Sequence, residues 1–288
     1  MSDVKFTGAV SGDLNVAGNY SPSGVPIAGD TIIFDGSTNP ADTSMATFNL
    51  IDTITVIVTP NQTKAIGTSG NPLQVQDAAK LFYNGPNCPQ CYYAPNTCTE
   101  AHVLATMGAG GNASLVLQSG AITSLFVSQA SKLSIDGTVT TGYFGSGDIV
   151  ATLESGGTIT TAYIAGGKYT ANGTITTCDM HGGEVVYQGA SKNITALNLK
   201  APGVIFRWNA ASSTITKINA YAGLFDATTD LNTKTITNMD IHFGATVDLR
   251  CGANVITASN APNLYGGILE VGNNAITFTT SIAPPRKA

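Results

Sequence analysis

A short phrase of alternating apolar and polar residues recurs along the C-terminal two thirds of the chain. It consists of an aliphatic residue followed by threonine, and nine copies follow one another at intervals of 16–21 residues. The third and fifth residues after the aliphatic position are again small or apolar in most copies. A glycine then follows in most copies, and after it a second short segment with alternating apolar positions, such as Leu133/Ile135 and Val185/Tyr187. The nine copies begin at Ile122, Val139, Ile159, Ile175, Ile194, Ile215, Ile236, Ile256 and Ile276.

This pattern predicts an all-β fold, a parallel β-solenoid (β-helix) with about 16–21 residues per coil. Alternation with period two and β-branched enrichment are typical of strands. Short strands repeated at a fixed period, with glycine at the corners and no helical segment between them, indicate stacked coils. Coils pair at about 4.8 Å, so equivalent side chains form rows. We therefore expect the phrase isoleucines to be buried in one row, with the following threonines facing outward.

The chain is expected to form a single domain. Residues 1–110 are predicted to be an N-terminal cap and the first coils, with strand patterns at 32–34 and 53–58. Residues 85–102 are predicted to be a cysteine-containing loop insertion. Residues 111–282 are predicted to be regular coils, and the prolines of residues 283–288 are expected to keep this tail out of the sheets.

Composition excludes several classes of protein. With 43% hydrophobic and 11% charged residues, the chain has too little charge for a disordered chain or a coiled coil. The sequence contains no run of about 18 apolar residues, so no membrane-spanning helix is predicted. The 13 basic and 18 acidic residues argue against nucleic acid as a partner, because phosphate binding needs clustered Lys and Arg. The start of the chain lacks the apolar segment of a signal peptide, so we expect synthesis in the cytoplasm and no entry into the general secretory route on its own.

The one constellation with metal-ligand spacing is Cys88, Cys91, Cys98 and His102. A C-x2-C-x6-C-x3-H arrangement can surround one structural zinc ion, because the C-x2-C turn directs two thiolates at one point. Two alternatives are a disulfide within the loop with one spare thiol, and free thiols. The zinc and the disulfide would both staple the loop, and four protein ligands would leave no open position for catalysis.

Some β-solenoids degrade polysaccharides, which requires two carboxylates near each other on one face. The only acids in the outward position four residues after each phrase start, Asp179 and Asp240, lie three coils apart, about 14 Å at the strand spacing. Glycosidase pairs stand roughly 5–9.5 Å apart. Asp226, Asp230 and Asp248 have basic neighbours and are expected to form surface ion pairs. We therefore expect no enzymatic activity. The full outward column is Phe126, Tyr143, Tyr163, Asp179, Asn198, Asn219, Asp240, Asn260 and Thr280, and its aromatic members are candidates for a contact surface.

Residues 13–36 contain Val25-Pro26, then Gly29-Asp30, then a strand. This order resembles the opening of the β-solenoid virion structural proteins of tailed phages, which are similar to head decoration proteins. Tyr20 stands where these proteins usually have tryptophan. Residues 65–75 and 213–250 continue the likeness.

The resemblance implies a non-enzymatic virion protein, a capsid decoration or cement protein on the head surface. Its partner would be the major capsid protein or another virion protein, and it would form a homo-oligomer. We expect the acidic, loop-rich N-terminal region to make the specific contact. The alternatives are a tail fibre or spike domain that binds a host-surface glycan, and a polysaccharide-degrading β-helix enzyme.

Overall fold

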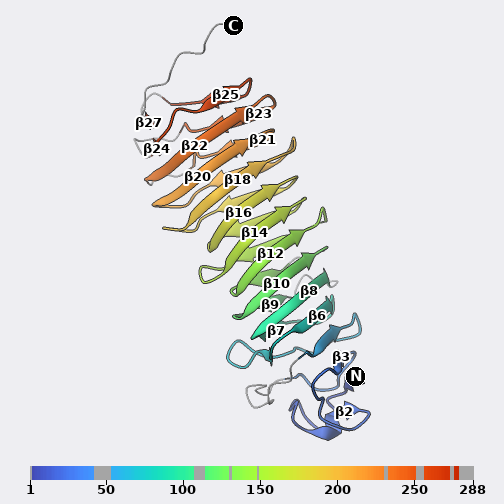
Figure 1. The fold of residues 1–288 in the computed structure, drawn as a ribbon. Coiled ribbons are helices and arrows are strands. Elements are labelled where there is room, and N and C mark those ends of the chain that lie inside the picture. Colours follow the sequence, from blue (N-terminus) through green and yellow to red (C-terminus); the bar gives the residue numbers. More distant parts are fainter. Residues whose placement is uncertain are drawn as a thin grey trace. The chain divides into compact units, whose positions relative to one another are not determined.

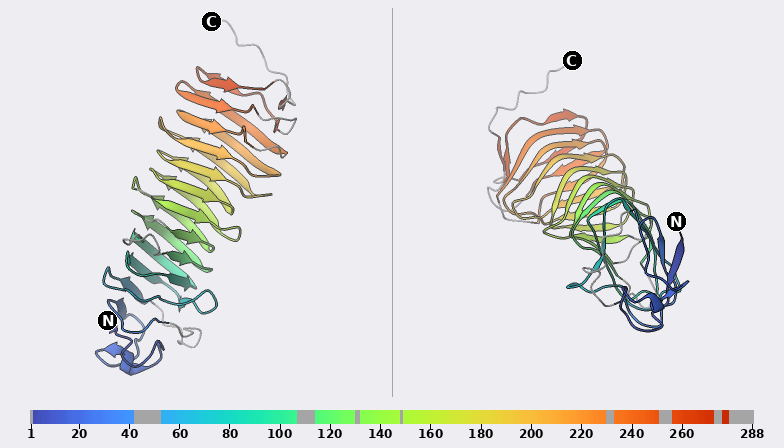
Figure 2. Two further views of the ribbon diagram at one scale, coloured as in Figure 1. Left: turned by 180° about the vertical axis from the view of Figure 1, so that it is seen from behind. Right: turned by 60° about the horizontal axis from the view of Figure 1, so that its bottom comes forward.

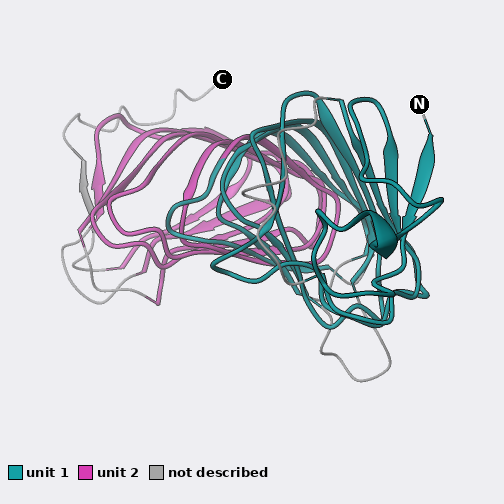
Figure 3. Cartoon of the chain, turned by 90° about the horizontal axis from the view of Figure 1, so that it is seen from below, with its two compact units in different colours: residues 1–158 teal, residues 159–288 magenta. Residues whose placement is uncertain are grey.

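The computed structural model describes residues 2–41, 53–106, 114–129, 132–147, 149–229, 233–250, 256–272 and 276–278. Its internal contacts divide the chain into two compact units, residues 1–158 and 159–288 (Figure 3). The division lies inside the segment 111–282 that the sequence predicts as regular coils. Within the described residues the helical structure is one 3-10 turn, η1 (Ala17–Asn19), and no helix there is long and apolar enough to cross a membrane. The tail 283–288 lies outside the described residues.

Each regular coil of unit 1 gives one strand to each of two sheets (Figure 1). The first sheet has the order β2-β1-β3-β4-β6-β8-β10-β12 and the second the order β5-β7-β9-β11-β13. All pairings recorded in this unit are parallel except β1 with β2. The strands are β1 (Asp3–Phe6), β2 (Tyr20–Ser21), β3 (Thr31–Phe34), β4 (Thr55–Val58), β5 (Leu73–Val75), β6 (Ala79–Asn84), β7 (Cys91–Pro95), β8 (Thr97–Ala105), β9 (Leu115–Leu117), β10 (Ala121–Val127), β11 (Leu133–Ile135), β12 (Thr138–Phe144) and β13 (Val150–Leu153).

Unit 2 repeats this arrangement, and Figure 2 shows the strands of one coil beside those of the next within each unit. Its first sheet has the order β14-β16-β18-β20-β22-β24-β27, with β25 also on β22, and its second has β15-β17-β19-β21-β23-β26 in sequence. The strands are β14 (Thr158–Ile164), β15 (Lys168–Ala171), β16 (Thr174–Met180), β17 (Glu184–Tyr187), β18 (Asn193–Leu199), β19 (Ile205–Trp208), β20 (Ser213–Ala220), β21 (Gly223–Asp226), β22 (Lys234–His242), β23 (Ala245–Asp248), β24 (Ile256–Ala258), β25 (Asn263–Tyr265), β26 (Ile268–Glu270) and β27 (Ile276–Phe278). The predicted parallel β-solenoid is confirmed.

The phrase isoleucines form an inward row, as the sequence predicts. Ile194 pairs in register with Ile215, and Ile215 with Ile236, and all three are fully buried. Ile159 and Ile175 are buried as well, whereas the threonine that follows each of the first eight phrase residues, Ile122 to Ile256, is exposed or half-buried. Burying an aliphatic side chain stabilises the fold by about 1.5–3 kcal/mol. The aliphatic residue of the repeated phrase therefore marks a core position in each of these coils.

The N-terminal segment that carries the resemblance is a structural turn. Both carboxylate oxygens of Asp30 accept backbone hydrogen bonds, from Ser2 at 2.7 Å and Ile27 at 3.0 Å, directly before β3. The Tyr20 ring packs edge-on against Phe6 with centroids 5.6 Å apart, and its hydroxyl donates to the Leu14 carbonyl at 2.8 Å. These residues fix where β2 and β3 begin, so their role here is in folding rather than chemistry.

Candidate functional site

The predicted zinc ligands lie on the strands of ordinary coils and on one turn. Residues 85–90, which contain Cys88, connect β6 to β7, whereas Cys91 begins β7 and Cys98 lies in β8. Cys91 is in register with Leu115, and Cys98 with Ile122. All three cysteines are buried free thiols, so no disulfide joins them. Cys91 and Cys98 occupy places in the coil interior that aliphatic residues take in the neighbouring coil.

His102 does not approach these thiols. It lies on the outer face of β8, where its imidazole is stacked between Phe82 at 4.9 Å and Phe126 at 4.7 Å, while Cys98 on the same strand is buried in the inward row. Across the described ranges, no three His, Cys, Asp or Glu side chains gather as metal ligands do. The structure therefore does not bring the four predicted ligands together around one point.

Burial favours the neutral form of these uncoordinated thiols. Burial raises the pKa of Cys88 and the pKa of Cys98 to about 11 each. The Tyr93 hydroxyl lies near the Cys98 thiol without a hydrogen bond of regular geometry. These cysteines act as small apolar residues of the core.

The outward column in unit 1 is a row of stacked aromatic rings. Phe82, His102, Phe126 and Tyr143 follow one another at 4.9, 4.7 and 4.9 Å with nearly parallel planes, which matches the spacing of paired strands. The repeated phrase predicts Phe126 and Tyr143 in this row but not Phe82 and His102. The coils of these two residues lack the aliphatic-threonine phrase, and β6 pairs with β8 through a register shift after Ala79. Neighbours cover the ring faces within the row, so it stabilises the coil stack more than it offers a platform to a ligand.

The same column in unit 2 is a hydrogen-bonded row of amides and acids. The register places Asp179, Asn198, Asn219 and Asp240 in successive coils, as predicted. Asn198 donates to Asp179, and Asn219 donates to Asn198 at 2.6 Å. Lys200 pairs with Asp179 at 2.9 Å, and Lys217 pairs with Asp240. These two carboxylates are three coils apart and already bonded, so they do not form a catalytic pair.

Asn263, rather than the predicted Asn260, follows Asp240 in this row. Asn263 is in register with Asp240 and donates to it at 2.8 Å. The phrase that begins at Ile256 lies on β24, which ends at Ala258. Asn260, the fourth residue after Ile256, therefore falls in the connection to β25. Asn260 instead donates to Asn238 at 2.8 Å.

Acids on the second sheet of unit 2 are neutralised by arginines. Arg207 bridges Glu184 at 2.6 Å and Asp226 at 2.5 Å, and Arg250 bridges Asp248 at 2.7 Å and Glu270 at 2.6 Å. Hydrogen bonds from Arg250 hold the pKa of Asp248 below its ordinary value, whereas a general acid needs a raised pKa. The ion pairs predicted for Asp226 and Asp248 are confirmed, and Asp230 lies outside the described residues.

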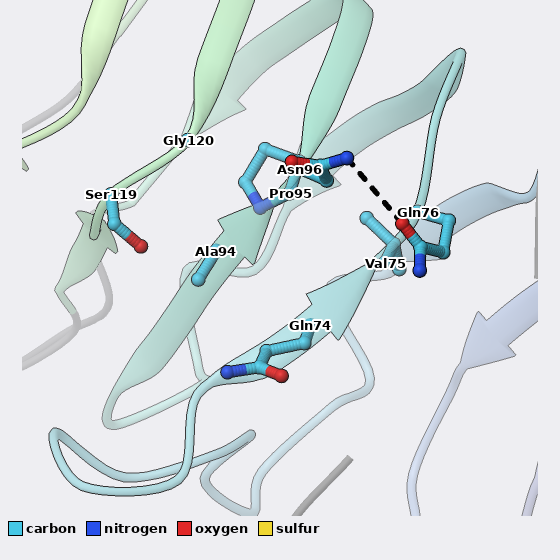
Figure 4. A pocket seen from close by; sticks show the side chains of 8 residues that line it. All are labelled: Gln74, Val75, Gln76, Ala94, Pro95, Asn96, Ser119 and Gly120. Carbon is cyan, nitrogen blue, oxygen red and sulfur yellow. Dashed lines mark hydrogen bonds between the residues drawn. The ribbon is translucent and has the colours of Figure 1, made fainter. Parts of the chain in front are cut away.

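A hollow of about 440 Å³ lies in unit 1 where strands of the second sheet turn toward the first. We call it the corner hollow, and its lining is Gln74, Val75, Gln76, Ala94, Pro95, Asn96, Ser119 and Gly120 (Figure 4). Its origin is a difference in corner length. The middle coil passes from β7 to β8 through one residue, Asn96, whereas the coils on either side use residues 76–78 and 118–120. The short corner is recessed between two longer ones.

The floor of the corner hollow is a close contact between two coils. A Cβ atom on Gly120 would lie 1.6 Å from the Pro95 carbonyl oxygen, and the φ of Gly120 is +79°. Only glycine allows this approach. The recess is therefore fixed by a backbone contact. Of its polar side chains, Gln74 lies on β5, and Gln76, Asn96 and Ser119 lie on the three corners.

Comparisons of the chain with protein-family models, with curated proteins and with solved structures find no match. The fold, the rows of side chains and the corner hollow are thus the observations from which a function can be argued.

Proposed function

We propose that this chain is a non-enzymatic structural protein of a tailed-phage virion, attached to the capsid surface as a decoration protein. The main support for this proposal is that outward side chains of successive coils contact one another in rows. These rows contain stacked aromatic rings in unit 1, and hydrogen-bonded amides and ion pairs in unit 2. A preorganised surface of this kind loses little entropy on docking. The resemblance of residues 13–36 to virion β-solenoids supports the same assignment.

The N-terminal loops of unit 1 supply a contact surface for this role. Val10 is 65% exposed and Ile27 is 68% exposed, beside a short edge strand, β2, that is followed by Pro22. Both residues belong to the loops that precede β3, and large apolar side chains left in water are typical of docking surfaces. We assign the capsid lattice as the partner of these loops.

A rebinding assay tests this assignment. Capsids stripped of the protein are incubated with the full-length chain or with the double variant Val10→Asp/Ile27→Asp. The variant is expected to bind at least about tenfold more weakly, because two charged groups would replace apolar contacts. Val150→Asp is the control, since Val150 is 52% exposed on β13, away from the loops. Equal occupancy by the double variant, or no rebinding of the unmodified chain, would contradict the proposal.

A further inference from the structure

The corner hollow combines an apolar floor with a neutral hydrogen-bonding rim. Val75, Ala94 and Pro95 are buried and form the floor. Four amide and hydroxyl side chains surround them, as Figure 4 shows: Gln74, Gln76, Asn96 and Ser119. Small-molecule sites commonly measure about 300–1,000 Å³ and have this composition, apolar walls with a few placed polar groups.

The rim groups retain unused hydrogen-bonding capacity. The Asn96 amide nitrogen donates to Asp77 at 2.8 Å and to the Gln76 side-chain oxygen at 3.5 Å. These bonds orient the Asn96 oxygen as an acceptor and the Gln76 nitrogen as a donor. Among the described residues, the Asn96 side-chain oxygen and the Gln76 side-chain nitrogen have no hydrogen-bond partner. The same holds for the Gln74 amide and the Ser119 hydroxyl. Donors and an acceptor thus stand side by side.

The charge of the lining restricts the ligand class. None of the eight lining residues is ionisable. Phosphate and nucleic acid ligands need Arg or Lys, and a divalent cation needs carboxylates. The adjacent acid, Asp77, is already bonded to Asn96 and to Thr97 at 3.1 Å. The lining is therefore matched to an uncharged ligand whose groups both donate and accept.

We propose that the corner hollow binds a neutral saccharide. Sugar hydroxyls donate and accept hydrogen bonds, as the Gln76 and Asn96 amides require, and the C–H face of a sugar ring can lie on Ala94 and Pro95. This site is independent of the capsid contact, because it uses the second sheet and its corners rather than the N-terminal loops.

Binding is tested with the purified full-length chain on an array of neutral and anionic oligosaccharides, followed by calorimetry with the best neutral one. The unmodified chain is expected to bind a neutral oligosaccharide. The double variant Gln74→Ala/Gln76→Ala is expected to bind it roughly tenfold more weakly, for the loss of about two neutral hydrogen bonds. Folding should be preserved, because among the described residues the Gln74 side chain has no hydrogen-bond partner and the Gln76 side chain accepts one long bond, from Asn96.

Two further variants sharpen the test. Ala94→Leu would fill the floor without removing a polar group and is expected to abolish the same binding. Gln188→Ala is the control, because Gln188 is exposed and, like Gln76, is the first residue after a second-sheet strand, here β17. Absence of binding to every neutral oligosaccharide, binding confined to anionic ones, or equal affinity of the double variant would each overturn the proposal. The capsid assay uses other residues, so either proposal can fail alone.

Discussion

Replacing Ile194 by aspartate is expected to cost more than about 4 kcal/mol of stability, which is a large part of what a folded chain possesses. Ile194 is fully buried and in register with Ile215 of the next coil. An aspartate there would place a carboxylate in the aliphatic row beside Ile215, and Lys234, a buried cation of this unit, is already engaged with the Trp208 carbonyl and ring. The measurement is urea unfolding followed by the fluorescence of Trp208, the one tryptophan, which is fully buried in the same unit.

Thr195→Asp is the control for this variant. Thr195 is the next residue along β18 but faces outward and is exposed. A surface change of this kind is expected to alter stability by no more than about 0.5 kcal/mol. Similar midpoints for Ile194→Asp and Thr195→Asp would show that the inward and outward faces are wrongly assigned.

Gly120→Ala is expected to destabilise unit 1 by more than about 3 kcal/mol. Two effects add: the new Cβ would meet the Pro95 oxygen at 1.6 Å, and an alanine is strained at a φ of +79°. The coils would have to separate at the corner hollow. Thermal unfolding followed by circular dichroism measures the loss.

Two control variants separate the two effects. Gly203 has a φ of +84° but nothing within 4 Å of its added Cβ, so Gly203→Ala reports backbone strain alone, about 1–2 kcal/mol. Gly70 has open space and no positive φ, so Gly70→Ala is expected to be nearly neutral. If Gly120→Ala cost no more than Gly203→Ala, the close approach of the coils at Pro95 would be wrong.

The core could be predicted from the sequence because the buried positions of a solenoid recur once per coil along the chain. The spacing of the repeat predicted that the residue after Ile194 faces outward and that Asp179 and Asp240 lie in one outward column. It also predicted the ion pairs of Asp226 and Asp248. The prediction worked where each coil pairs with the next in one register, since equal spacing then means equal position.

Prediction failed where local features break that register. The spacing of the cysteine segment is that of a zinc site, yet two successive residues of β8, Thr99 and Glu100, face outward. This break in the alternation places Cys98 and His102 on opposite faces of the strand. Asn260 was misplaced because a connection replaces strand at that position. The corner hollow arises from corner lengths in three consecutive coils, and it could not be recognised before the strand ends around Asn96 were known.

A three-dimensional reconstruction of the purified virion tests the central proposal most directly. The account predicts density on the outer surface of the head that matches a parallel β-solenoid, with the loops that carry Val10 and Ile27 against the capsid lattice. Finding this chain only in the tail fibres, or nowhere in the particle, would contradict the account.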